Sequence, residues 1–378
     1  MTSVHVQEAE PALKGDAVVA ALTTYLAETE REYRGLGLKW NEEAKSEARY
    51  RFAASEAYLG KLSAPVFAGW CARNLWIQTK AGTVVPFHLN PMQYRFLVAV
   101  FELVDQGLPV RMVILKARQF GFSTLIQAIL YYNSSVHRNF NATIIAHKAE
   151  ATSNLYAMSL RYHRHLPHRA RTKRSGMKGI IFDDPHDSTI RLDTAENKEA
   201  GRSSTNRGVH ASELAFWPWA KTTRLGLVQT VADVPGTFIF EESTANGVGG
   251  TFHDQYWRAK SNTAGFYRAM FFPWFENPEY VQPCKPSLKE SLFDHLDREE
   301  QEGRERWGWT AEQILWRRAT IEDKCEGDVT KFHQEYPSTD RQAFLVSGSA
   351  VFDADQVARR FEEIQEPVFV GRLVRTET

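Results

Sequence analysis

The chain has 378 residues, of which 43% are hydrophobic and 24% charged, and these proportions exclude a disordered or fibrous protein. Lys plus Arg and Asp plus Glu both number 46, which excludes a globally basic nucleic-acid coat protein but not a local basic stripe. The three cysteines form no CxxC pair, the N-terminus does not read as a signal peptide, and no apolar stretch approaches the ~18 residues that span a bilayer, so we expect a soluble intracellular protein with no membrane partner.

Helical spacing dominates the N-terminal stretch. Residues 16–34 and 41–62 mix apolar and charged residues at helical spacing, without the alternation of a strand. We assign residues 1–82 to an N-terminal helical arm, which serves either internal packing or contacts within an oligomer.

From residue 83 the pattern changes to strands that alternate with helices. Short apolar runs rich in β-branched residues predict strands at 110–116, 142–148, 179–182, 189–195, 208–216 and 237–245. Helices are expected directly after the first of these strands, over 150–165 and over 221–232. The alternation predicts an α/β fold over residues 83–282, with a mostly parallel sheet covered by helices on both faces.

The C-terminal part is helical and charged. Thr310 and Gln313 have the spacing of a capping box that opens a helix over 311–321. We assign residues 283–345 to a helical lid or linker subdomain and residues 346–378 to a connecting segment.

The strand at 110–116 runs into the segment KARQFGFST (116–124) and then into a helix, which is the layout of a P-loop. Gly121 would let the backbone N–H groups approach an anion, and the Ser123 hydroxyl would ligate Mg²⁺. The usual pattern G-x-x-x-x-G-K-[ST] is not met, because Lys116 stands at its first glycine and Phe122 at its lysine. Taken alone, the segment is equally consistent with a tight turn that binds no nucleotide.

Three other features favour a nucleotide. One strand ends in Ser212-Glu213, where P-loop ATPases place a carboxylate beside Mg²⁺ and a catalytic glutamate. The next strand ends in the small polar residues 243–246, which could sense a γ-phosphate. Upstream, the amide of Gln93 could pair with the edge of an adenine, the alternative being an ordinary helix residue.

The order of these motifs resembles the ATPase half of the large terminase subunit of tailed phages, the motor that packages double-stranded DNA. The similarity covers about residues 85–350 and includes HASELAFW, ESTANG, WRR and FHQEYPSTDRQAF. KARQFGFST resembles the deviant phosphate loop of some terminases, in which the lysine stands at the front of the motif. The resemblance implies a P-loop NTPase fold of the additional-strand, helicase-like kind, with ATP and Mg²⁺ as cofactors.

The resemblance also implies roles for single residues. The phosphate-binding positions are Lys116, Arg118, Gln119, Gly121, Phe122, Ser123 and Thr124, although Arg118 could instead brace the loop by a salt bridge. Glu213 matches the catalytic glutamate, and Arg207, with Arg202 as its competitor, matches an arginine offered to a neighbouring subunit's nucleotide. The coupling motif corresponds to Ser243, Thr244 and Asn246. Ser212 stands where most members carry a Mg²⁺-side aspartate, so Ser123 and Ser212, with waters, are the expected metal-side groups.

Residues 161–178 carry seven Lys or Arg, three His and no acidic residue. Clustered cations of this kind bind duplex DNA phosphates, and the expected contacts are Arg169, Arg171, Lys173 and Arg174. The alternative is a solvated helix face and loop.

Members of the family usually carry an RNase H-like nuclease domain after the ATPase. Only about 30 residues follow Ser347, too few for such a domain at ~50 residues or more. We therefore expect no nuclease activity, with residues 346–378 connecting toward an absent nuclease domain that is truncated or a separate chain.

The sequence thus predicts an ATP-hydrolysing motor subunit that moves double-stranded viral DNA into a procapsid. The resemblance implies a homo-oligomeric ring, usually of five, on the portal protein, a small terminase subunit as partner, and the host cytoplasm as location. Two alternatives stay open: a DNA-stimulated helicase or translocase outside packaging, and a degenerate, non-hydrolysing P-loop scaffold suggested by Phe122 and Ser212.

Overall fold

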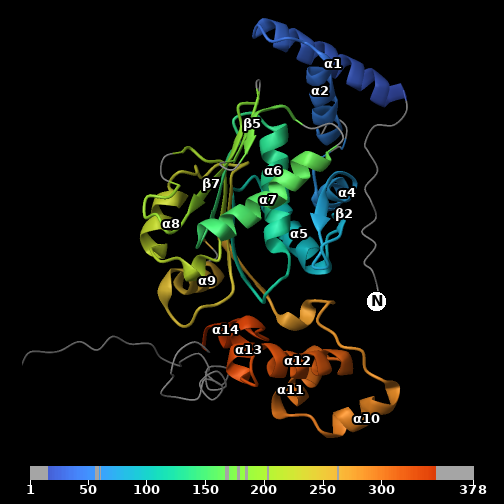
Figure 1. Ribbon diagram of the computed structural model, residues 1–378. Helices are drawn as coiled ribbons and strands as arrows, with labels where there is room; N and C mark the ends of the chain where they lie inside the picture. Colours follow the sequence, from blue (N-terminus) through green and yellow to red (C-terminus); the bar gives the residue numbers. More distant parts are fainter. Residues whose placement is uncertain are drawn as a thin grey trace, which may run out of the picture.

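The computed structural model describes residues 16–55, 59, 61–166, 170–176, 179–183, 186–201, 204–261 and 264–345. A central sheet carries helices on both faces. Two N-terminal helices lie at one end of the molecule, and a group of C-terminal helices lies at the other end (Figure 1). The predicted α/β class with helical additions at both ends is confirmed. Residues 346–378 lie outside the described residues.

Over the described residues, the main sheet has eight strands in the order β10-β3-β9-β8-β4-β7-β6-β5. The strands are β3 (Val110–Lys116), β4 (Asn141–Ala146), β5 (Thr172–Gly176), β6 (Gly179–Phe182), β7 (Thr189–Thr194), β8 (Gly208–Ser212), β9 (Phe238–Ser243) and β10 (Tyr267–Phe272). Neighbours from β10 to β7 pair in parallel, and β6 and β5 extend the sheet as an antiparallel edge.

Strand β9 lies between β3 and β8, which is the additional-strand arrangement that the sequence predicts. Glu242 of β9 is in register with Ile114 of β3 on one side and with Ser212 of β8 on the other. Every residue of β3 is buried, as expected for a parallel strand covered on both faces. The carboxyl ends of β3, β9 and β8 therefore lie side by side at one edge of the sheet.

Helices cover the two faces in separate layers (Figure 1). On one face lie α5 (Pro91–Asp105), α6 (Phe122–Val136) and α7 (Ala149–His165), which bury the larger apolar core; on the other lie α8 (Ala220–Val228) and α9 (Gly250–Ser261). The short 3₁₀ segment η1 (Leu214–Phe216) follows β8 on the second face. α6 begins directly after the phosphate loop, so this loop is clamped between a buried strand and a buried helix.

The N-terminal region forms α1 (Asp16–Gly35) and α2 (Glu42–Ala54), which fall in the two ranges with helical spacing, and α4 (Ala64–Asn74), which lies beyond them. It also contains the hairpin of β1 (Trp76–Gln78) and β2 (Val84–Pro86), which the prediction of helix alone misses. Helix α2 docks on α6 through the hydroxyls of Tyr50 and Ser135, 2.8 Å apart, and through Tyr132, which donates to the Ala54 carbonyl at 2.6 Å.

The C-terminal helices follow β10 and the 3₁₀ segment η2 (Trp274–Glu276). They are α10 (Pro286–Asp294), α11 (Arg298–Trp307), α12 (Ala311–Lys324), α13 (Val329–Glu335) and α14 (Asp340–Leu345). The capping box of Thr310 and Gln313 at α12 is confirmed. Within the described ranges, every helix is too short or too polar to cross a bilayer.

Candidate nucleotide site

Three strand ends bring one ammonium group and two carboxylates together. Lys116 ends β3, Glu213 follows β8, and Glu242 is the second-to-last residue of β9. Lys116 Nζ lies 3.2 Å from Glu213 Oε1 and 3.2 Å from Glu242 Oε2. The Lys116 side chain is only 8% exposed, so this ammonium is aimed into the site and not into solvent.

The electrostatics of the trio keep its two buried members charged. Burial disfavours the Lys116 ammonium, but the carboxylates of Glu213 and Glu242 outweigh it and raise the Lys116 pKa above its ordinary value. Burial likewise disfavours the Glu242 carboxylate, but Lys116 and the hydrogen bonds that Glu242 accepts outweigh it and hold its pKa well below the usual range. Both groups are therefore ionised at neutral pH.

Glu213 is held in an unusual backbone conformation. Its φ of +53° lies in the left-handed region, which costs a non-glycine residue about 1 kcal/mol and is found at functional sites. Glu213 Oε2 accepts from Ser243 Oγ at 3.2 Å and from the Thr244 N–H at 3.4 Å. Asn246 Nδ2 donates to the carbonyl of Ala215 at 3.1 Å. The residues predicted to couple hydrolysis to movement thus grip the turn that carries Glu213.

The phosphate loop meets the uncapped start of α6. Gly121, the residue before the helix, has φ +74°, and a Cβ there would lie 2.8 Å from Gln93 Nε2. Among the described residues, no side chain caps this helix, so its first N–H groups remain available to an anion. Gln119 is exposed with φ +55°, and the Thr124 hydroxyl donates to Met158 Sδ at 3.8 Å.

The Phe122 side chain does not fit the phosphate-binding role. It is 1% exposed and packs against the rings of Phe96, Phe120 and Phe272, the last with ring centroids 4.4 Å apart. The ring is therefore not available to a phosphate, and a phosphate contact from the Phe122 backbone N–H stays a prediction.

Ser123 and Ser212, the predicted metal-side residues, both turn to Glu242. Their hydroxyls donate to Glu242 Oε1 at 2.6 and 3.0 Å. The predicted site set omits Glu242, although it is fully buried at the centre of the cluster. The sequence offers one clue to this role: Glu242 directly precedes Ser243, the first of the coupling residues. Glu241 points to the opposite face, where its Oε1 lies 2.8 Å from Arg224 Nε.

Arg118 and Gln93 have partners within the chain. Arg118 forms an ion pair with Glu335 of α13, and its N–H donates to the Glu335 carbonyl at 3.1 Å. Gln93 forms a capping box with Asn90, and its Nε2 donates to the Gly121 carbonyl at 2.7 Å. The structure thus shows Arg118 bracing the loop and Gln93 fastening α5 to it. Their contacts to phosphate and to adenine stay predictions.

Arg207 does not join Glu213 within this chain. It precedes β8, at the amino-terminal edge of the sheet, and donates to the Gly236 carbonyl at 3.3 Å beneath the Phe140 ring. A role toward a neighbouring subunit's nucleotide stays a prediction. Its competitor, Arg202, lies outside the described residues.

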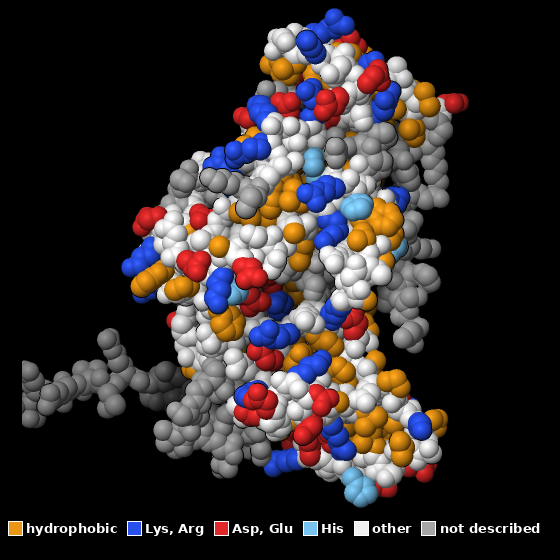
Figure 2. Space-filling model, viewed as in Figure 1, with side chains coloured by type: hydrophobic (Ala, Val, Ile, Leu, Met, Phe, Trp, Pro, Cys, Tyr) orange, Lys and Arg blue, Asp and Glu red, His pale blue; other side chains and the backbone are white. Residues whose placement is uncertain are grey.

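The basic run crosses the edge strand β5. Lys173 and Arg174 are exposed there, while Arg171 Nη2 lies 3.3 Å from Asp183 Oδ2. Lys173 Nζ lies 3.8 Å from Asp187 Oδ1. Acidic residues from outside the run thus partly balance it, in keeping with the mixed charges on the face in Figure 2. Arg169 lies outside the described residues.

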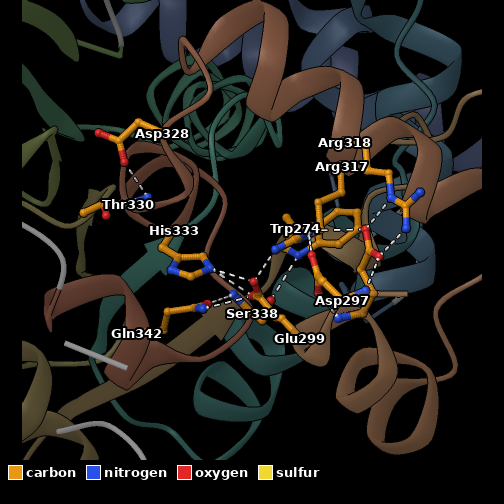
Figure 3. Close-up of polar contacts among 11 residues, drawn as sticks. Trp274, Asp297, Glu299, Arg317, Arg318, Asp328, Thr330, His333, Ser338 and Gln342 are labelled. Carbon is orange, nitrogen blue, oxygen red and sulfur yellow. Dashed lines mark hydrogen bonds and ion pairs between the residues drawn. The ribbon is translucent and has the colours of Figure 1, made fainter. Parts of the chain in front are cut away.

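A partly buried polar cluster joins the C-terminal helices (Figure 3). Arg317 of α12 contacts Asp297 Oδ2 at 3.0 Å and also pairs with Glu299 of α11. Glu299 Oε2 lies 2.9 Å from His333 Nε2 of α13. Burial opposes the Glu299 carboxylate, but His333 and Arg317 outweigh it and lower its pKa to about 2. α13 also carries Glu335, the partner of Arg118, so one helix contacts both the cluster and the phosphate loop.

Comparisons with known proteins support the fold. No family model matches the chain, and no curated protein matches it. The large terminase of bacteriophage HK97 is 15% identical over 72% of this chain and 54% of its own, with a TM-score of 0.50. The large terminase ATPase domain of Thermus phage P74-26 is 15% identical over 63% of this chain and 92% of its own, with a TM-score of 0.41.

The chain therefore has a P-loop NTPase fold, and more particularly the fold found in a large terminase. It spans about half the length of the HK97 protein. The resemblance that the motifs indicate is confirmed for the fold.

Proposed function

We propose that this chain is an ATP-hydrolysing motor subunit that translocates double-stranded viral DNA into a phage procapsid. One observation carries the proposal: Glu213 is held in a left-handed turn, 3.2 Å from Lys116, at the strand edge where the phosphate loop enters α6. The fold shared with the HK97 large terminase supports the same reading.

The site residues divide the work of phosphoryl transfer. The N–H groups at the start of α6 bind the phosphates, and Lys116 balances their charge. Mg²⁺, when bound, neutralises charge on the phosphates, with Ser123 among its protein-side groups. The γ-phosphate competes for the Lys116 ammonium and so releases Glu213 Oε1 to orient water and accept its proton.

The coupling residues connect this step to the rest of the chain. Ser243 and Thr244 hold the second oxygen of Glu213, and Asn246 holds the turn that follows it. When the γ-phosphate is lost, Lys116 pairs with Glu213 again. This pairing alters the hydrogen bonds that Glu213 accepts from Ser243 and Thr244. The partners proposed with this function are duplex DNA, the portal, a small terminase subunit and further copies of the chain in a ring, usually of five, with the complex docked on the procapsid in the host cytoplasm.

The test is Glu213→Gln, which keeps size and hydrogen bonding but removes the basicity. We expect nucleotide affinity close to that of the parent, while turnover falls by ~10²–10⁴ for loss of general-base help. Affinity is measured with a fluorescent nucleotide analogue, and turnover by phosphate release with duplex DNA present. Glu279→Gln, an exposed glutamate paired with Lys80, is the control and should change neither value.

The outcomes separate the alternatives. Retained turnover in Glu213→Gln would contradict the assignment of the base, and lost affinity with lost turnover would make Glu213 structural. A parental chain that hydrolyses no ATP in the presence of duplex DNA would favour the non-hydrolysing scaffold. Unwinding of a forked duplex would favour a helicase.

A further inference from the structure

We propose that Glu242 supplies the metal-side carboxylate of the nucleotide site, moved from β8, where Ser212 stands, to the neighbouring strand β9. This inference rests on the proposed ATPase function and names a residue that the motif comparison does not assign. It explains how a site with serine at the usual aspartate position keeps a carboxylate beside the phosphate-loop hydroxyl.

The strand register places the Glu242 carboxylate beside Ser212, where the usual aspartate is missing. Glu242 is the direct partner of Ser212 across the β8–β9 pair, and the Ser212 hydroxyl donates to Glu242 Oε1 at 3.0 Å. The Ser123 hydroxyl, in the first turn of α6, donates to the same oxygen at 2.6 Å. P-loop enzymes hold Mg²⁺ between such a hydroxyl and a strand-end aspartate. Here the carboxylate that contacts the hydroxyl comes from β9.

A buried chain of hydrogen bonds fixes Glu242 from behind. Ser159 Oγ donates to Gln127 Oε1 at 2.9 Å, and Gln127 Nε2 lies 2.7 Å from His210 Nδ1. Because an amide nitrogen only donates, His210 Nδ1 accepts, and the ring proton is on Nε2. His210 Nε2 therefore donates to Glu242 Oε1, 3.1 Å away. Glu242 Oε1 thus receives three donors, which holds this carboxylate in one place.

The donors suit Mg²⁺ and not a softer metal. A carboxylate and hydroxyl groups are the hard oxygen ligands that Mg²⁺ prefers, and Mg²⁺ usually takes one or two carboxylates together with substrate phosphates and waters. Among the described residues, no group of three or more His, Cys, Asp or Glu could hold a metal without such help. We therefore expect Mg²⁺ to bind together with the nucleotide and not before it.

The chain offers a matched control and a rescue. Glu241, next to Glu242 and equally buried, faces the other side of the sheet with Arg224, so Glu241→Gln changes the same chemistry away from the site. Ser212→Asp alone sets a second carboxylate against Glu242, and like charges at this distance repel. The double variant Ser212→Asp/Glu242→Gln returns the carboxylate to β8 and removes that repulsion.

The experiment measures how much Mg²⁺ strengthens binding of a fluorescent ADP analogue, as the ratio of Kd in EDTA to Kd in Mg²⁺. We expect Glu242→Gln to lower this ratio by about 10- to 100-fold, the usual cost of disturbing a metal site, with little change in EDTA. Glu241→Gln should keep the parental ratio, and the double variant should recover most of it. Thermal melting of each variant confirms that it is folded.

Each result is decisive. A parental ratio in Glu242→Gln would overturn the inference while leaving the ATPase proposal intact. A double variant that stays as defective as Glu242→Gln, while folded, would mean that position 212 cannot replace Glu242 and would overturn the transfer between strands. A parental chain that binds no nucleotide in either buffer would overturn the proposed function, and the inference with it.

Discussion

Lys116 and its two carboxylates depend on one another. The ammonium is buried between Glu213 and Glu242, and Glu242 is fully buried. Removing one member of a buried ion pair commonly costs about 3–5 kcal/mol, because the remaining charge keeps its desolvation penalty. The lysine thus stabilises the strand ends before it serves any nucleotide.

We therefore predict that Lys116→Ala abolishes ATP turnover and also lowers the melting temperature, because Glu242 loses its counter-charge. The double variant Lys116→Ala/Glu242→Gln should recover much of the stability, since the buried carboxylate is gone, but no turnover. Phosphate release and thermal unfolding are measured in parallel. This pair of variants separates the role of the lysine in phosphate binding from its role in folding.

Arg118→Ala is the companion variant in the same loop. The Arg118 side chain is 54% exposed in its ion pair with Glu335, so loss of this pair should cost under about 1 kcal/mol of stability. If Lys116→Ala hydrolyses ATP near the parental rate, the front-lysine assignment is wrong, and Arg118 becomes the candidate.

Elements with a strong local pattern were predicted well. β3 occupies 110–116 as predicted, and α7 differs from the predicted 150–165 by one residue at its start. β5 was missed because TKRSG has no apolar alternation; it becomes a strand only by pairing with β6, a tertiary effect that overrides local preference. β10 was also missed.

The site was predictable as far as it follows from strand ends. Lys116, Glu213 and Ser243 each stand at the carboxyl end of a recognisable strand, and such ends meet at one edge of a parallel sheet. Glu242 needed the strand order as well, since only the position of β9 between β3 and β8 sets it against both hydroxyls. The burial of the Phe122 ring depends on packing among residues distant in sequence.

The C-terminal helices allow a stability prediction. The Glu299 pKa falls from its ordinary 4.5 to about 2 in the folded chain, a difference worth about 3 kcal/mol. Because the folded pKa is depressed, this stabilisation is present above about pH 4.5 and is lost as pH falls toward 2. We expect Glu299→Gln to lower the free energy of unfolding at pH 7 by about 2–4 kcal/mol and to flatten its decline below pH 4.5.

Glu302→Gln on the same helix is the control. Its partner Arg298 and its own side chain are exposed, so we expect a loss below about 1 kcal/mol and an unchanged acid slope. Denaturant unfolding at several pH values measures both variants. Equal effects of the two substitutions would contradict a special contribution from the cluster around Glu299.

In the whole molecule, the basic strand and the nucleotide site lie far apart. β5 is the last strand of the sheet, four inter-strand spacings from β8 and six from β3, the two outer strands of the site. At ~4.8 Å per spacing, roughly 20 to 30 Å separate β5 from the site. Changes in the basic run should therefore act on DNA binding without touching nucleotide affinity, so that the two properties can be tested independently.

We predict that replacing Arg169, Arg171, Lys173 and Arg174 with Ala weakens duplex binding at low salt. It should also reduce the slope of log K against log salt by about 2–4, since each neutralised phosphate contributes ~0.9. A control with equal loss of charge replaces exposed cations remote from β5, namely Lys80, Lys289, Arg298 and Lys331, each paired with an acidic side chain. The control should keep the parental slope, and both proteins should bind the ADP analogue as the parent does. An unchanged slope in the β5 variant would mean that the basic run is only a solvated surface. Equal losses of slope in both proteins would show a general effect of net charge and no particular DNA surface.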